Sequence, residues 1–154
     1  MDTLEDDWTP TLEDTPFLRL GGQEAVYRLS EAFYDAMSEH EPELARMHDV
    51  DEAGRVTGPI RANFGLFLCF WLGGPRDYLE HRGHPRLQLR HAPFRIDTEM
   101  RDAWLRSMTR AMDVLEVGGG LRRHLDGRFG QVADFLRNTE DGTPHPSGVQ
   151  LRHG

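Results

Sequence analysis

The chain of 154 residues has a single cysteine, Cys69, and this scarcity excludes an internal disulfide and a cysteine-based zinc site. It has no apolar run of about 18 residues, so no membrane span is predicted, and its acidic N-terminus lacks the apolar core of a secretory signal. Basic residues are also few, with 18 Lys and Arg against 26 Asp and Glu. The net charge of −8 argues against nucleic acid or an anionic membrane as a partner. A soluble protein of the reducing cytoplasm is expected.

The alternation of apolar and polar residues that marks a half-buried strand is missing too, and no internal repeat is present. Apolar residues instead recur every three or four positions, which predicts four long helices within residues 26–37, 60–71, 100–115 and 121–136. Gly73 and Gly74, followed by a proline, end the second of them, and Asp97 or Thr98 is suited to cap the third. Two shorter helices are expected at 41–47 and 85–91. The sequence therefore predicts an all-α fold.

The two ends of the chain differ in composition from its middle. Residues 1–16 are acidic with few apolar side chains, and residues 139–154 are rich in turn-forming residues without periodicity. We interpret both as flexible tails around one helical domain at 17–138, a length that allows a buried core and one cofactor. The segment 73–96 holds no long helix, and so long a connection in a compact domain indicates a functional loop.

This loop contains three histidines, His81, His84 and His91. His91 stands two residues before a proline, where a short helix must stop, and Leu87 and Phe94 provide an apolar wall beside it. A carbonyl in the last turn of that helix is suited to accept one ring N–H, which would orient the imidazole and leave its other nitrogen free for a metal. Two alternatives stay open from these residues alone: a structural histidine, and a zinc site that uses all three.

The same stretch is rich in arginine although the whole chain is acidic. A run of arginines is often only a solvated face, but arginine also pairs well with carboxylate or phosphate, so an anion site is the second interpretation. The residues concerned are Arg76, Arg82, Arg86, Arg90 and Arg95.

Two predicted helices place a side chain with a hydrogen-bond donor among apolar neighbours. Tyr34 and Trp104 either close the rim of the core or donate to a ligand in a shared pocket. The helix at 60–71 is unusually aromatic, which is typical of a core but also of a wall against a flat aromatic cofactor. Its large apolar members are Phe64, Phe67, Leu68, Phe70 and Trp71.

Taken together, these features resemble the group II truncated haemoglobins over residues 17–138. The resemblance rests on several short motifs that occur in the family's order. They are Gly21-Gly22, Phe33-Tyr34, Met47-His48, Trp71-Leu72-Gly73-Gly74-Pro75, Gly83-His84-Pro85-Arg86-Leu87, Arg90-His91-Ala92-Pro93-Phe94 and Asp102-Ala103-Trp104-Leu105. The resemblance implies a truncated globin fold, a two-over-two helical sandwich that encloses haem.

On this resemblance His91 is the proximal ligand of the haem iron, and Tyr34 and Trp104 reach the ligand on the distal side. His48 falls at a distal position where the family places Tyr, Phe or His. The distal helix carries no glutamine or histidine that faces the iron, so ligand stabilisation would depend on these three side chains. The other implied members of the haem site are Ile60 and Phe64 facing the iron, Phe67, Leu87 and Phe94 in the apolar wall, and Arg90, Tyr78, Arg86 and His84 near the propionates.

The resemblance implies a haem b protein that binds O₂, NO, CO, cyanide or sulfide reversibly. Tight stabilisation of O₂ disfavours oxygen delivery and favours redox detoxification of NO or peroxide, a dioxygenase- or peroxidase-like activity that draws electrons from an external reductase. The alternative is an O₂ or NO sensor, or a storage protein, without turnover. A monomer or homodimer is expected, and His48 or Tyr34 is a candidate iron ligand in the ligand-free state.

Overall fold

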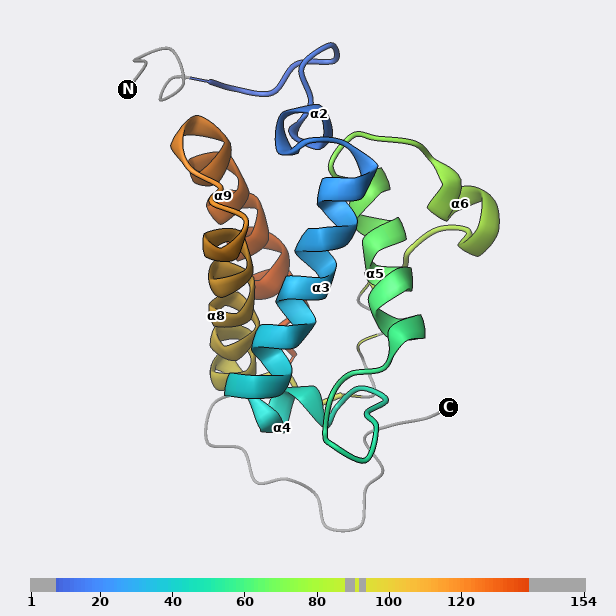
Figure 1. Cartoon of the computed structure of the whole chain (residues 1–154), viewed down its shortest axis with the longest axis vertical. Helices are drawn as coiled ribbons and strands as arrows, with labels where there is room; N and C mark the ends of the chain where they lie inside the picture. Colours follow the sequence, from blue (N-terminus) through green and yellow to red (C-terminus); the bar gives the residue numbers. More distant parts are fainter. Residues whose placement is uncertain (1–7, 88–90, 92–93, 139–154) are drawn as a thin grey trace.

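The computed structural model describes residues 8–87, 91 and 94–138, and within them it is helical without a strand. The long helices are α3 (Gln23–His40), α5 (Gly58–Trp71), α8 (Thr98–Val114) and α9 (Gly119–Leu136), and the short ones are α2 (Pro16–Leu20), α4 (Pro42–Ala45) and α6 (Asp77–Arg82). Figure 1 shows α3 beside α5, with α8 and α9 as a second pair. The pairs meet mainly where α3 packs on α8. This is the two-over-two sandwich that the resemblance predicted.

Helix boundaries follow local signals in the sequence. Asp97 caps α8, because its side chain accepts a hydrogen bond from the backbone N–H of Met100 at 3.0 Å. Thr15 caps α2 in the same way through the N–H of Leu18 at 3.2 Å. Gly73, with φ of 96°, lets the chain turn sharply after α5, a conformation that costs glycine little. The segment that leads toward α6 therefore leaves α5 at a fixed point.

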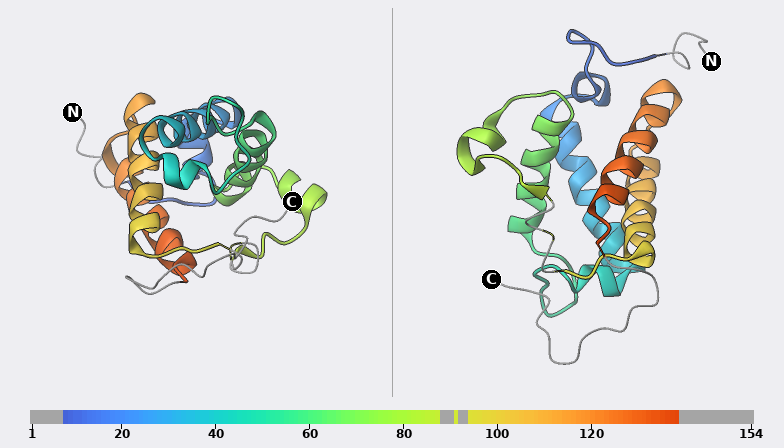
Figure 2. Two further views of the ribbon diagram at one scale, coloured as in Figure 1. Left: turned by 90° about the horizontal axis from the view of Figure 1, so that it is seen from below. Right: turned by 180° about the vertical axis from the view of Figure 1, so that it is seen from behind.

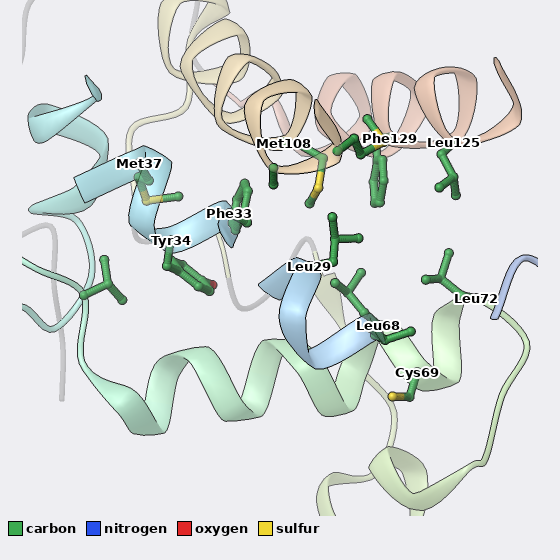
Figure 3. Close-up of a cluster of buried hydrophobic side chains, with 14 of the residues drawn as sticks. Leu29, Phe33, Tyr34, Met37, Leu68, Cys69, Leu72, Met108, Leu125 and Phe129 are labelled. Atoms are coloured by element: carbon green, nitrogen blue, oxygen red, sulfur yellow. The ribbon is translucent and has the colours of Figure 1, made fainter. Parts of the chain in front are cut away.

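The core lies between the two helix pairs and is made of apolar faces that meet at helical spacing (Figure 3). Its fully buried members come from all four long helices: Val26, Leu29, Phe33, Met37, Leu68, Met108, Met112, Leu125 and Phe129. Cys69 is buried at the edge of the same cluster. All nine of these fully buried members lie within the ranges predicted for the four long helices, so the hydrophobic period located this part of the core.

A buried arginine fixes α5 against α3. Arg61 is only 6% exposed, and its guanidinium contacts Glu31 at 2.9 Å and Asp35 at 2.7 Å. Its Nε also donates to the carbonyl of Val56 at 2.8 Å, and its own carbonyl accepts from the Ser30 hydroxyl at 2.7 Å. The buried guanidinium charge is therefore paired with two carboxylates of α3 and hydrogen-bonded to the loop before α5, which links α5 to both.

Two elements were not expected from the sequence. Helix α6 lies inside the segment 73–96, and α2 begins at Pro16, where the predicted tail ends. Trp8, also inside the predicted tail, is buried against His124 of α9, with ring centroids 5.7 Å apart. Trp8 is held in this position by a nearby residue, because its indole N–H donates to the Asp14 carboxylate at 2.9 Å. Of the short helix expected at 85–91, residues 88–90 lie outside the described part of the chain.

Candidate functional site

A cavity of about 530 Å³ opens between α5 and α9. Side chains of α3, α8 and the segment after α4 also line it, together with Leu87, His91, Phe94 and Ile96. Its volume is typical of cofactor sites. Figure 2 shows the arrangement of these helices from below and from behind. Many of the predicted site residues line it: Tyr34, His48, Ile60, Phe64, Phe67, Tyr78, Leu87, His91, Phe94 and Trp104. The structure thus brings together side chains that are far apart in the sequence.

His91 faces this cavity with one ring nitrogen already engaged. Its Nδ1 lies 2.7 Å from the backbone carbonyl of Leu87, four residues earlier, so Nδ1 carries the proton and donates. Burial lowers the pKa of His91, so the ring is neutral at pH 7. A neutral imidazole with a bonded Nδ1–H presents the lone pair of Nε2, which is the state needed for a metal ligand.

Tyr34 and Trp104 line the cavity from α3 and α8 and are held by shared aromatic neighbours. The Phe33 ring lies 4.8 Å from the Tyr34 ring and 5.2 Å from the Trp104 ring, and Phe64 contacts both from α5. Figure 3 shows the Tyr34 ring between α3 and α5. Because three helices contribute to this cluster, both rings have little freedom to turn away.

Both side chains keep a hydrogen-bond donor for whatever fills the cavity. Among the residues that the structure describes, neither the Tyr34 hydroxyl nor the Trp104 indole N–H meets a protein acceptor. Tyr34 is 5% exposed, and this burial raises the pKa of its phenol well above the ordinary value, so the hydroxyl keeps its proton. Two neutral donors that share one apolar cavity suit a small electronegative ligand.

His48 completes this side of the cavity. Its Nδ1–H donates to the carbonyl of Leu44 at 3.0 Å, and its ring packs edge-on against Tyr34 with centroids 5.6 Å apart. Burial lowers the pKa of His48, and the nearby His91 lowers it further. The ring is therefore neutral at pH 7, with its Nε2 lone pair left as an acceptor.

The sequence reasoning missed two polar residues of the lining, Asn63 and Arg101. Both were recoverable from helical spacing, since Asn63 follows Ile60 by three positions and Arg101 precedes Trp104 by three. Asn63 Oδ1 is buried without a hydrogen-bond partner, which leaves this amide available to a group in the cavity. Arg101 is bound to Asp134 of α9 at 2.8 Å and to Asp102 at 3.1 Å.

Two predicted site residues, His84 and Arg86, are not among the described side chains of this lining. Arg90 lies outside the described residues. His84 and Arg86 are exposed, and the His84 Nδ1 accepts a hydrogen bond from the Arg86 backbone N–H at 3.0 Å. Among the side chains that the structure describes, no three of His, Cys, Asp or Glu gather as a metal site, and the His81 side chain of the zinc alternative lies outside them.

Comparison with known proteins places this arrangement in a family. A model of bacterial-like globins matches residues 15–138. The chain is 38% identical over 117 residues to group 2 truncated hemoglobin YjbI of Bacillus subtilis, covering 76% of this chain and 84% of that protein. The crystal structure of the group II truncated hemoglobin from Bacillus anthracis superposes with a TM-score of 0.74 at 34% identity, over 82% of this chain and 98% of that one. The X-ray structure of truncated oxygen-avid haemoglobin from Bacillus subtilis gives 0.72 at 35%, over 80% and 99%.

Proposed function

The chain belongs to the bacterial-like globin family, among its group II truncated haemoglobins, and from this premise we propose that it binds haem b through His91 and holds O₂ and other small ligands tightly for redox chemistry on NO or peroxide. The observation that carries the proposal is the pair of unpartnered donors, Tyr34 and Trp104, on one cavity with a neutral His91. Together these groups can hold a metal cofactor and a polar ligand within one apolar space.

The chemistry of the cavity suits haem. Aromatic and aliphatic side chains dominate the lining, as a flat apolar macrocycle requires, and neutral His91 has its Nε2 free. Arg101 is a polar lining group suited to the carboxylates of haem, with Arg90 a further candidate for that role. Held by His91, haem would supply an iron able to bind a diatomic ligand in the cavity.

The residues of this chain determine how firmly such a ligand is held. The Tyr34 O–H and the Trp104 N–H donate to an electronegative ligand, and Ile60 and Phe64 keep water away, which strengthens both hydrogen bonds. Hydrogen bonds to a charged acceptor contribute roughly 1.5–3 kcal/mol each. Since about 1.4 kcal/mol is tenfold in an equilibrium constant, two such bonds slow ligand release by on the order of 10²-fold or more.

Slow release is poorly suited to oxygen delivery and well suited to consuming the ligand where it is bound. Converting NO and O₂ to nitrate takes up one external electron per nitrate, and reducing peroxide to water takes up two, so we propose an external reductase as a partner. The truncated haemoglobin of Bacillus subtilis is an oxygen-avid protein, which agrees with tight binding here.

Each helix in the described part of the chain is too short or too polar to span a lipid bilayer.

The test combines O₂ dissociation with turnover. Stopped-flow replacement of O₂ by CO in the haem-loaded protein should give slow release, and anaerobically prepared NO mixed with the O₂-loaded protein should yield nitrate. Continued nitrate formation with a generic flavin reductase and NADH would support redox detoxification. Slow O₂ release without any reaction of NO or peroxide would refute it in favour of storage or sensing.

A further inference from the structure

Asn138, just beyond the end of α9, holds the backbone of the segment that carries His91. Its Nδ2 donates to the carbonyl of Phe94 at 2.9 Å and to that of His91 at 3.3 Å. Its Oδ1 accepts from the Ile96 N–H at 2.9 Å, and its own N–H donates to the Ile96 carbonyl at 2.8 Å. These four hydrogen bonds join Asn138 to residues more than 40 positions earlier in the sequence.

The three residues that Asn138 holds share a property: His91, Phe94 and Ile96 all line the cavity, whereas Asn138 itself does not. The orientation of its amide is fixed by chemistry, since a backbone N–H faces one end and two carbonyls face the other. The amide N–H groups therefore donate to the carbonyls of residues 91 and 94, and the amide oxygen accepts from the N–H of residue 96. We call these contacts the donor arm and the acceptor arm of Asn138, and the two together the clamp.

We propose that Asn138 is a positioning residue for His91, setting the place of the imidazole relative to the haem that the cavity accepts; this rests on the proposed function. The imidazole has one further anchor, its Nδ1–H bond to Leu87, and that bond fixes ring rotation rather than the path of the backbone. The carbonyl of His91 is held by Asn138 and by the Phe94 N–H at 3.0 Å. Loosening the donor arm frees the backbone on the C-terminal side of His91.

Two substitutions separate the arms of the clamp. Asn138→Asp keeps an oxygen for the Ile96 N–H but, ionised at pH 7, cannot donate to the two carbonyls. Asn138→Ala removes both arms and keeps the backbone bond. Arg137→Ala is the matched control, because Arg137 neighbours Asn138 and donates to Thr98 at 3.3 Å, so it joins the end of α9 to α8.

The experiment measures haem transfer from each haem-loaded variant to excess apomyoglobin, together with the iron–histidine stretching band of the ferrous protein by resonance Raman. We expect Asn138→Asp and Asn138→Ala to lose haem about tenfold faster, the equivalent of about 1.4 kcal/mol, and to shift or broaden that band. Arg137→Ala should match the unsubstituted chain on both readouts.

An unchanged band and transfer rate in both Asn138 variants would overturn the proposal. So would a lower melting temperature with an unchanged band, because that result would make Asn138 a purely structural residue. Wild-type behaviour of Asn138→Asp alone would refute the donor arm. Failure of the proposed function is distinguishable, since the unsubstituted chain would then show neither haem uptake nor an iron–histidine band.

Discussion

Replacing Trp104 by phenylalanine tests the donor that the structure leaves without a protein acceptor. Phenylalanine keeps an aromatic ring against Phe33 and Phe129, which lie 5.2 and 5.7 Å from the indole, and removes only the N–H and part of the ring. One hydrogen bond to a charged acceptor contributes roughly 1.5–3 kcal/mol. Trp104 is not fully buried, so we take the lower end of this range and expect O₂ to dissociate at least about tenfold faster.

The assay is stopped-flow replacement of O₂ by CO in the haem-loaded variant, with CO dissociation measured by NO replacement as an internal reference. CO accepts hydrogen bonds weakly, so its release should change far less than that of O₂. Trp71→Phe is the matched control, because Trp71 lines the same cavity and stacks on Phe129 at 5.3 Å. An unchanged O₂ rate in Trp104→Phe, or an equal acceleration in Trp71→Phe, would refute the role of the indole donor.

Other substitutions test the remaining parts of the account. His91→Gly should lose haem, or lose its five-coordinate ferrous spectrum and regain it with added imidazole; normal haem binding would refute the proximal assignment. Burial lowers the pKa of His48 below its unfolded value of about 6.5, so the unfolded state binds more protons and the haem-free protein should lose stability as pH falls from 7 to 5. His48→Phe should flatten this loss in thermal melts, and an unchanged pH slope would contradict it. His48→Phe with an unchanged low-spin fraction in the ligand-free spectrum would also eliminate His48 as a sixth ligand. Arg61→Met should lower the free energy of unfolding by about 2 kcal/mol, because it leaves buried carbonyls without a donor; a urea midpoint equal to wild type would show that the buried charge contributes no net stability.

Helical spacing predicted the four long helices and the core because α3, α8 and α9 each bury a regular apolar stripe, whereas the stripe of α5 is partly buried and lines the cavity. It also pointed at the cavity, since Tyr34, Phe64 and Trp104 lie on those stripes. The family resemblance added the assignment of His91, which no spacing rule distinguishes from a structural histidine. The structure adds its Leu87 hydrogen bond and its neutral, Nδ1-protonated ring.

What the sequence did not predict depends on contacts between distant residues. Helix α6 has only six residues, too few for a periodic signal, and α2 depends on a cap at Thr15 and on docking against α3 and α9. Asn138 lies at the border of a segment that composition marks as a tail, and its importance appears only when α9 brings it beside residues 91–96. Pairings of this kind are properties of the folded chain, so no local pattern encodes them.

The central claim, a haem held by His91 with a cavity open to small ligands, is tested most directly by one absorption experiment. The purified protein is measured as isolated, after reduction with dithionite, and after addition of CO. We expect a Soret band that moves on reduction and moves again with CO, because a haem held by His91 would have an iron accessible to an added ligand. The absence of a Soret band even after addition of hemin, or a reduced spectrum that CO leaves unchanged, would contradict it.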